Sequence, residues 1–221
     1  NYGASGVSNY KFSVYCNYVR ENSTFPYTFS EYLFEEPSGT TVFDTKGPNN
    51  GTLVDNVQRV NGVLGGGIEL TGSGYVNFGN CFGENVENEV TLSSWIKPNT
   101  DTGDFQGIIM HGGTNTDTYA LYILPSTKGI GFKTSGTTSA WTAISNVTRL
   151  WDGNWHHLSA TYDGAKKIIY LDNEPLITVA ATGNIESGSG YNLLIGAGRD
   201  ELNPTNLFNG KIDEARIYNY A

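Results

Sequence analysis

The sequence predicts an all-β fold, an antiparallel β-sandwich or barrel. Apolar and polar residues alternate along many short runs, as expected for strands that bury one face. Glycine, Asp-Gly and Asn turns separate these runs at short intervals, and glycine supplies 28 of the 221 residues. No stretch keeps a helical period, so at most one short helical turn is expected, near Val57–Gly62.

The expected strands follow one another from the YLFEE segment at 32–36 onward. A turn-rich loop at 37–51 comes next. The segment 162–176 predicts a hairpin on an Asp-Gly turn, because two apolar runs flank that dipeptide closely. Further strands are expected at 67–70, 75–79, 89–98, 107–113, 118–125, 129–136, 155–164, 166–175, 192–199 and 210–220.

Residues 1–28 differ from the rest of the chain. They carry seven aromatic side chains, and Pro26 lies near the end of the segment. Lys11–Val19 is a candidate strand, because Phe12 and Cys16 share one face with other apolar residues. We expect 1–28 to be an N-terminal extension or an added edge strand, and 29–221 to be the main domain.

The charge balance excludes two classes of partner. Acidic residues outnumber basic ones by 22 to 13, which gives a formal net charge of −9. Nucleic acids and anionic membranes are bound through clustered Lys and Arg, so no nucleic-acid partner is expected. No run of 18 apolar residues occurs, and no membrane insertion is expected. Because the chain begins with Asn and shows no signal sequence, we expect it to be part of a larger multidomain chain.

The two cysteines, Cys16 and Cys81, match no zinc-binding spacing. A disulfide between them and a pair of buried free thiols are both compatible with the sequence. Three Asn-x-Ser/Thr sequons, at Asn22, Asn50 and Asn146, hint at an extracellular setting.

Four blocks of the sequence resemble a laminin-G-like (LamG-like) jelly-roll domain of the concanavalin A-like lectin/glucanase superfamily. They are 32–53, then 68–79 with 90–98, then 153–176, and finally LLIGAGRD with LFNGKIDEARIYNYA up to the end of the chain. The resemblance implies a jelly-roll sandwich over residues 29–221. It implies less about activity, because this fold carries sugar-binding modules, glycoside hydrolases and polysaccharide lyases.

Hydrolysis is not favoured by the acidic residues. Retaining glycoside hydrolysis needs two carboxyl groups about 5–5.5 Å apart. The pairs Asp213-Glu214 and Glu35-Glu36 are adjacent in sequence, so in a strand their side chains are expected on opposite faces. The acid–x–acid–x–x–acid run of the superfamily's glucanases is missing.

A lyase would need a base such as His or Tyr and a group that neutralises a uronate carboxylate. An acidic polysaccharide would meet an acidic protein, and the paired Arg and Tyr strand signatures of alginate-lyase-like jelly rolls are missing. Roles as ordinary strand and turn residues are favoured, and no catalytic residue is predicted. The candidates for such a site are His111, Tyr119, Tyr122, Arg149 and Gln106.

The neighbouring residues His156 and His157 cannot chelate one ion, because a strand points them to opposite faces. They are expected to be hydrogen-bonded residues in or near the core, and Trp155 and Trp95 to be packing residues. Arg216 lies two residues after Glu214, which predicts a surface ion pair.

The resemblance also implies one structural Ca²⁺ where the first loop meets the last strand. Calcium takes six to eight oxygen ligands. The family pattern places Glu35, Asp44 and Asp213 there, with Gly39 and Asn50 as sources of further oxygens. The alternative is that Asp44 forms an Asx-turn within its own loop and that Asp213 caps a β-bulge.

Sugar binding needs an exposed aromatic face beside groups that satisfy hydroxyls. Trp141 and Trp151 occur in turn-rich segments, although Trp151 could instead fill the core below an Asp-Gly turn. Trp141 is therefore the preferred contact. Loops that could converge with it at one end, or on the concave sheet, contain Tyr119, Asn115, Asp117, Arg199, Asp200 and Asn203.

The leading hypothesis is a carbohydrate-recognition module that binds a polysaccharide or glycan without catalysis. It would belong to a larger extracellular, cell-surface or virion protein. Two alternatives stay open. One is a lyase or hydrolase acting on cell-wall glycan. The other is a structural or adhesive spacer domain, since Tyr- and Asn-rich loops also suit protein interfaces.

Overall fold

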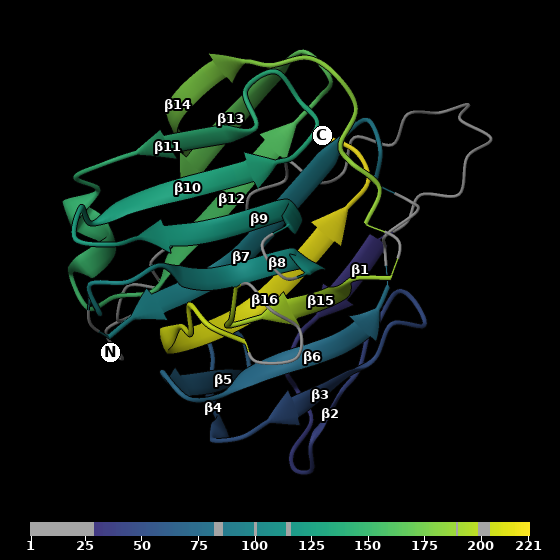
Figure 1. Cartoon of the computed structure of the whole chain (residues 1–221). Coiled ribbons are helices and arrows are strands. Elements are labelled where there is room, and N and C mark those ends of the chain that lie inside the picture. The colour runs from purple at the N-terminus through teal and green to yellow at the C-terminus, as the bar shows by residue number, and fades with distance from the viewer. Residues whose placement is uncertain (1–28, 82–85, 100, 114–115, 189, 199–203) are drawn as a thin grey trace, which may run out of the picture.

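Two antiparallel sheets pack face to face in the computed structural model (Figure 1), which describes residues 29–81, 86–99, 101–113, 116–188, 190–198 and 204–221. The predicted antiparallel sandwich is confirmed. The candidate strand Lys11–Val19 and Cys16 lie outside the described residues. Cys81 is buried and free.

The front sheet, nearer the viewer in Figure 1, has eight strands. It begins at an edge formed by β11 and ends at the short strand β2. In spatial order the strands are β11 (Trp141–Ile144), β10 (Gly129–Thr134), β9 (Thr116–Leu124), β8 (Gln106–Gly113), β15 (Asn192–Ile195), β6 (Tyr75–Asn80), β3 (Gly51–Val54) and β2 (Thr41–Val42).

The back sheet also has eight strands. Its main path is β14 (Glu174–Ala180), β13 (Lys166–Leu171), β12 (His156–Tyr162), β7 (Val90–Pro98), β16 (Asn209–Tyr218), β5 (Gly66–Thr71) and β4 (Val57–Asn61). The strand β1 (Phe29–Tyr32) pairs with residues Ala215–Tyr218 of β16. The first and last described strands are therefore neighbours in one sheet, and residues from Phe29 onward belong to the sandwich.

The core lies between the two sheets and follows the strand period of two. In β12, the residues His156, Leu158, Ala160 and Tyr162 are buried, and those between them are half-buried. Leu92 of β7 is fully buried in the same cluster. Burial of each such large apolar side chain stabilises the fold by about 1.5–3 kcal/mol.

The helical turn predicted near Val57–Gly62 is wrong. Residues 57–61 form β4, which pairs with Gly66–Leu70 of β5, so the sheet satisfies their backbone groups. The helical element of the described chain is a single 3₁₀ turn, η2 (Thr148–Trp151). No helix among these residues is long and apolar enough to cross a bilayer.

The adjacent histidines point to opposite faces, as predicted. His156 Nδ1 lies 2.8 Å from Asp172 Oδ2, and His156 Nε2 lies 3.0 Å from Asp152 Oδ1. Burial lowers the pKa of His156, but the two carboxylates outweigh this effect and raise the pKa above its ordinary value. His157 instead packs against Trp95, with ring centroids 5.3 Å apart, and burial lowers its pKa to about 4.

The His156 ion pairs predict a pH-dependent contribution to stability. Because the folded-state pKa lies above the unfolded value, the contribution is complete below an unfolded pKa of about 6.5 and is lost as pH rises through the folded-state pKa. Urea unfolding of wild type and His156→Gln at pH 5.5 and pH 8.5 measures it. Wild type should lose more stability than the variant by up to about 1 kcal/mol, because solvent screens the two partly exposed carboxylates. Equal losses would contradict this role for His156.

Candidate functional site

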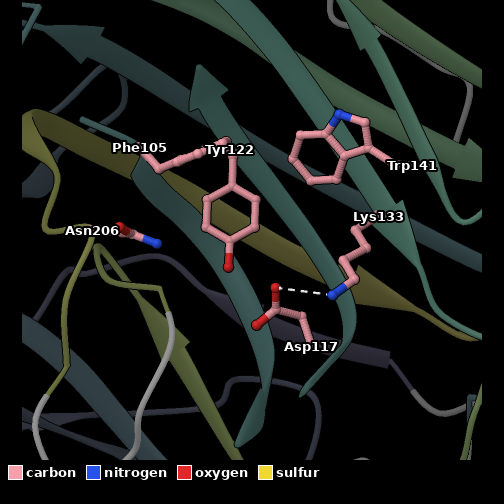
Figure 2. A pocket seen from close by; sticks show the side chains of 6 residues that line it. All are labelled: Phe105, Asp117, Tyr122, Lys133, Trp141 and Asn206. Carbon is pink, nitrogen blue, oxygen red and sulfur yellow. Dashed lines mark hydrogen bonds and ion pairs between the residues drawn. The ribbon is translucent and has the colours of Figure 1, made fainter. Parts of the chain in front are cut away.

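A pocket of about 170 Å³ lies on the outer face of the front sheet, close to the edge strand β11. Three aromatic rings and an ion pair share it, and the Tyr122 hydroxyl, the Asp117 carboxylate and Lys133 Nζ point toward one another (Figure 2). The volume is below the roughly 300–1,000 Å³ of pockets for drug-sized ligands, so it suits a single small ring. The lining residues are Phe105, Asp117, Tyr122, Lys133, Trp141 and Asn206.

Strand alternation places Trp141 and Lys133 side by side. Lys133 of β10 pairs directly with Trp141 of β11, and their side chains share the outer face. Phe132 belongs to the core on the opposite face. Gly131 gives the indole room, because a Cβ atom at that position would lie 2.6 Å from Trp141 Cζ2.

A β-bulge brings Asp117 to the same face. In the β8–β9 pair, Tyr119 is opposite His111 and Asp117 is opposite Gly112, so Thr118 is an extra residue. Strict alternation would place Asp117 and Tyr119 on one face. The bulge instead turns Asp117 outward while Tyr119 points into the core. There Tyr119 is buried and stacks on His111, with ring centroids 5.0 Å apart.

Two further aromatic rings support the indole. The ring centroids of Phe105 and Tyr122 each lie 6.1 Å from that of Trp141, and they lie 6.0 Å from each other. The Phe105 ring meets the indole edge-on, at 79°. Tyr122 is buried, whereas Trp141 is 42% exposed. Trp141 is thus held from the sides and offers apolar ring surface to solvent.

The polar part of the pocket is an ion pair between Asp117 and Lys133. Lys133 Nζ donates to Asp117 Oδ2 at 3.4 Å. Asp117 is 3% exposed, and its Oδ1 accepts no hydrogen bond from the described residues. The hydroxyl of Ser135 donates to the Asp117 carbonyl and fixes its backbone. The site therefore holds a buried carboxylate oxygen with free acceptor capacity.

Asn206 reaches the pocket from the segment that precedes β16, on the side of Phe105 and Tyr122 (Figure 2). The Gly107 N–H donates to the Asn206 carbonyl at 2.7 Å, which anchors this loop to β8. Gly198 packs against the Tyr122 ring, since a Cβ atom there would lie 2.5 Å from Tyr122 Cε1. Loop and sheet together form the rim of the site.

Of the predicted ligand-binding residues, Trp141 and Asp117 meet in this pocket. Tyr119 does not, because it lies in the core. Trp151 is partly buried against the core between the sheets, as its alternative interpretation holds, and its indole nitrogen is buried. The other predicted positions, Asn115, Arg199, Asp200 and Asn203, lie outside the described residues.

Sequence reasoning missed Phe105, Lys133 and Asn206 as site residues. A signal for Lys133 exists in the segment 129–134, where Ile130 and Phe132 alternate with two glycines and the lysine. That pattern places Lys133 on a face cleared of side chains. Phe105 and Asn206 lie on loops, and nothing in the local sequence indicates where these loops pack.

The residues considered for a lyase do not gather at one place. His111 and Tyr119 point into the core, whereas Tyr122 lies on the outer face. Arg149 lies in η2 and pairs with Glu174. The buried Gln106 accepts a hydrogen bond from the Asn209 N–H.

The carboxylates predicted as calcium ligands are occupied by hydrogen-bond donors. Asp44 Oδ1 accepts from the N–H groups of Glu31, Lys46 and Gly47 at 3.0–3.1 Å, and Asp44 Oδ2 from the Ser30 hydroxyl. The bonds to Lys46 and Gly47 form the Asx-turn of the alternative interpretation. Asn50 Oδ1, predicted as a further ligand, accepts from the Asp44 N–H at 2.9 Å.

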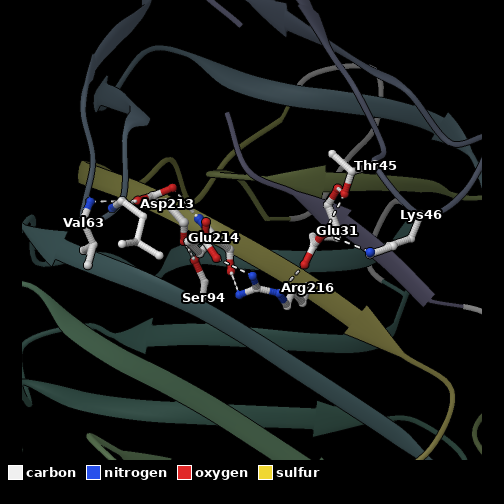
Figure 3. A network of polar contacts seen from close by, with 9 residues as sticks. Glu31, Thr45, Lys46, Val63, Ser94, Asp213, Glu214 and Arg216 are labelled. Atoms are coloured by element: carbon white, nitrogen blue, oxygen red, sulfur yellow. Dashed lines mark hydrogen bonds and ion pairs between the residues drawn. The ribbon is translucent and has the colours of Figure 1, made fainter. Parts of the chain in front are cut away.

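Asp213 lies at a β-bulge, as its alternative interpretation holds (Figure 3). Its Oδ2 accepts from the N–H groups of Val63 and Leu64 at 2.7 and 3.2 Å. Burial raises the pKa of Asp213 to about 6. The bulge residue Glu214 has a φ of 52°, so the strict alternation expected for Asp213-Glu214 fails here.

Glu214 and Arg216 form the predicted ion pair, but its predicted place on the surface is wrong. The side chain of Glu214 is 8% exposed, and Arg216 Nε also donates to Glu31 Oε1 at 2.9 Å. Glu31 in turn accepts from Thr45, so the network joins the first strand, the first loop and the last strand (Figure 3).

These contacts do not fit one calcium cage. Glu35 accepts from the Gly66 N–H at 2.9 Å, and the Gly39 carbonyl accepts from Arg59 at 3.3 Å. An N–H donor aimed at a carboxylate occupies the lone pairs that a cation would need. Within the described ranges, no three His, Cys, Asp or Glu side chains are placed to hold a metal ion. The calcium site stays a prediction.

Asp44→Ala separates the two interpretations of this loop. The variant leaves several backbone donors without their acceptor and should lose about 2–3 kcal/mol of unfolding free energy. If the Asx-turn accounts for the role of Asp44, urea unfolding gives the same loss in calcium and in chelator. The exposed Asp104→Ala serves as control and should cost less than about 0.5 kcal/mol. A chelator-dependent loss of wild-type stability that Asp44→Ala abolishes would instead support the calcium site.

The family model of laminin G type for the concanavalin A-like lectin/glucanases superfamily matches residues 70–221. The chain belongs to this superfamily. No curated protein matches the sequence. The match extends over the strands that carry Asp117, Tyr122, Lys133 and Trp141, so the pocket lies on a member of this fold.

Solved structures share the fold at low sequence identity. Domain 4 of AbnA, a GH43 extracellular arabinanase from Geobacillus stearothermophilus solved in complex with arabinotriose, aligns with a TM-score of 0.58 and 19% identity, over 87% of this chain and 92% of that domain. A botulinum neurotoxin DC binding domain in complex with SialylT aligns with a TM-score of 0.61 and 14% identity, over 86% and 47%.

A Trypanosoma rangeli sialidase, in complex with a difluorinated nononic acid, aligns with a TM-score of 0.60 and 14% identity, over 86% of this chain. The chain spans about half of the toxin binding domain and less than a third of the sialidase. At these identities the likeness shows the fold alone.

Proposed function

We propose that this chain is a non-catalytic carbohydrate-binding module that holds a sugar ring in the Trp141 pocket. The observation that carries the proposal is the exposed indole of Trp141 next to the Asp117–Lys133 ion pair. A pyranose or furanose ring has an apolar C–H face and a rim of hydroxyls. An aromatic face beside charged hydrogen-bonding groups matches both features.

The rigidity of the site supports the same role. Trp141 and Lys133 lie on paired strands, and the indole is held by Phe105 and Tyr122. A binding group that is already in place loses little conformational entropy when the ligand arrives. The single-ring volume of the pocket fits recognition of one unit of a longer chain that continues into solvent.

The wider setting of the module belongs to the proposal as well. The arabinanase neighbour is one domain of an extracellular enzyme, and the toxin neighbours are binding domains. By analogy, we place this module in a larger extracellular, cell-surface or virion protein, where it would bring its parent chain to a glycan.

Trp141→Ala should weaken retention on the glycan. Arabinotriose and the corresponding polysaccharide are the first probes, chosen from the ligand of the arabinanase domain. Loss of the stacking surface should weaken binding about ten-fold, equivalent to roughly 1.4 kcal/mol. Isothermal titration and affinity electrophoresis measure the affinity. The melting temperature should change little, since Trp141 lies on an edge strand and is 42% exposed.

Phe43→Ala is the matched control. Phe43 is 53% exposed and follows β2, at the opposite edge of the same sheet. This variant should bind like wild type. Ultraviolet absorbance and a reducing-end assay run on the same samples test the non-catalytic part. Release of unsaturated or reducing product would show an enzyme, and equal binding by Trp141→Ala and wild type would remove the pocket from the proposal.

A further inference from the structure

The charged residues of the Trp141 pocket indicate which sugars it can bind. The described lining contains one acid, Asp117, and one base, Lys133. Their side chains pair at 3.4 Å, so the formal charges cancel within the pocket. Lys133 is 22% exposed and Asp117 almost fully buried, so the carboxylate is the group that a ligand must satisfy.

One of the two oxygens of the Asp117 carboxylate lacks a hydrogen-bond donor from the described residues. Oδ2 faces Lys133, whereas Oδ1 is buried and receives no hydrogen bond from the described residues. A buried charged acceptor without a donor destabilises the fold unless a ligand or water supplies one. A sugar that fills the pocket would bring one hydroxyl as a donor to the carboxylate and a neighbouring hydroxyl as an acceptor from Lys133 Nζ. A pair of adjacent hydroxyls therefore complements the ion pair.

The same carboxylate disfavours an acidic ligand. A uronic or sialic acid would bring a second negative charge next to Asp117, and the only nearby cation of the described lining is already paired. Like charges a few ångströms apart repel most strongly where water is excluded. The formal net charge of −9 adds to this repulsion at longer range. A cationic amino sugar would likewise be repelled, because it would bring a second positive charge next to Lys133.

We infer that the pocket selects neutral, hydroxyl-rich sugar rings and rejects rings that carry a carboxylate, with Asp117 as the residue that sets this selectivity. The inference rests on the proposed function. Asn206 adds an uncharged amide at the rim, which can bind a hydroxyl as donor or acceptor. The stacked face on Trp141 supplies affinity for either class of ring, so the ion pair decides between them.

The experiment compares oligosaccharides that differ only in a carboxylate. Galactotriose with trigalacturonate, and glucose oligomers with their uronic acid counterparts, are titrated into the whole chain at low salt. Arabinotriose is titrated as a further neutral probe. Wild type should bind at least one neutral probe and should bind its acidic counterpart at least ten-fold more weakly. Neutral-probe affinity should stay within two-fold between about 20 and 500 mM salt, because no net charge is neutralised.

Asp117→Asn should reverse the preference. The variant weakens binding of the neutral probe at least ten-fold and frees Lys133 to bind the carboxylate of the acidic probe, whose affinity rises. Glu36→Gln is the matched control, because Glu36 also pairs with a base, Arg59 at 2.8 Å, and does not line the pocket. This control should keep the wild-type preference.

The outcomes separate the inference from the proposed function. Acidic probes that bind wild type as tightly as neutral ones overturn the selectivity but leave a carbohydrate-binding module. If Asp117→Asn keeps the wild-type preference for neutral probes, the selectivity role of Asp117 is also overturned and the carbohydrate-binding module remains. If wild type binds no probe of either class, the proposed function itself fails. Should Asp117→Asn not fold, the wild-type panel and its salt dependence still decide, since steep salt dependence indicates recognition through Lys133 rather than through Asp117.

Discussion

The shared apolar core is the constraint on which the rest of the structure depends. Both sheets bury one face against the other, so each strand must keep a fixed register. Phe132 and Tyr162, from opposite sheets, lie in this single cluster. Because side chains alternate along a strand, packing of the inner faces places every second side chain on the outer face of its sheet. Lys133 and Trp141 reach the outer face of the front sheet because their neighbours are needed in the core.

The positions where alternation fails are also where polar chemistry gathers. One extra residue, Thr118, turns Asp117 outward and leaves Tyr119 in the core. In the last strand, the bulge at Glu214 lets Asp213 accept backbone N–H groups from the β4–β5 turn while Glu214 pairs with Arg216. Bulges re-aim side chains at little cost to the rest of a sheet. Here one forms a pocket and the other ties the first and last strands together.

The two polar clusters differ in what their carboxylates still lack. Asp44 and Asp213 accept several N–H donors from the chain itself, so their lone pairs stabilise loops. Asp117 has Lys133 on one oxygen and no donor from the described residues on the other. A carboxylate whose oxygens all accept hydrogen bonds from the chain stabilises the fold. The Asp117 carboxylate, which lies next to an exposed indole and has one oxygen without a donor from the described residues, can bind a ligand.

The strand period and the turn residues suffice to predict the sandwich, because both are local properties that a shared core reinforces. The sequence also singled out Trp141 and Asp117, an exposed aromatic and an acid near turns. It misplaced Tyr119 and the segment 57–62, because a bulge and a strand pairing depend on partners distant in the chain. The alternation at 129–134 indicates which face Lys133 occupies. Its place beside Asp117, and the packing of Phe105 and Asn206 against the sheet, depend on long-range contacts that no local pattern encodes.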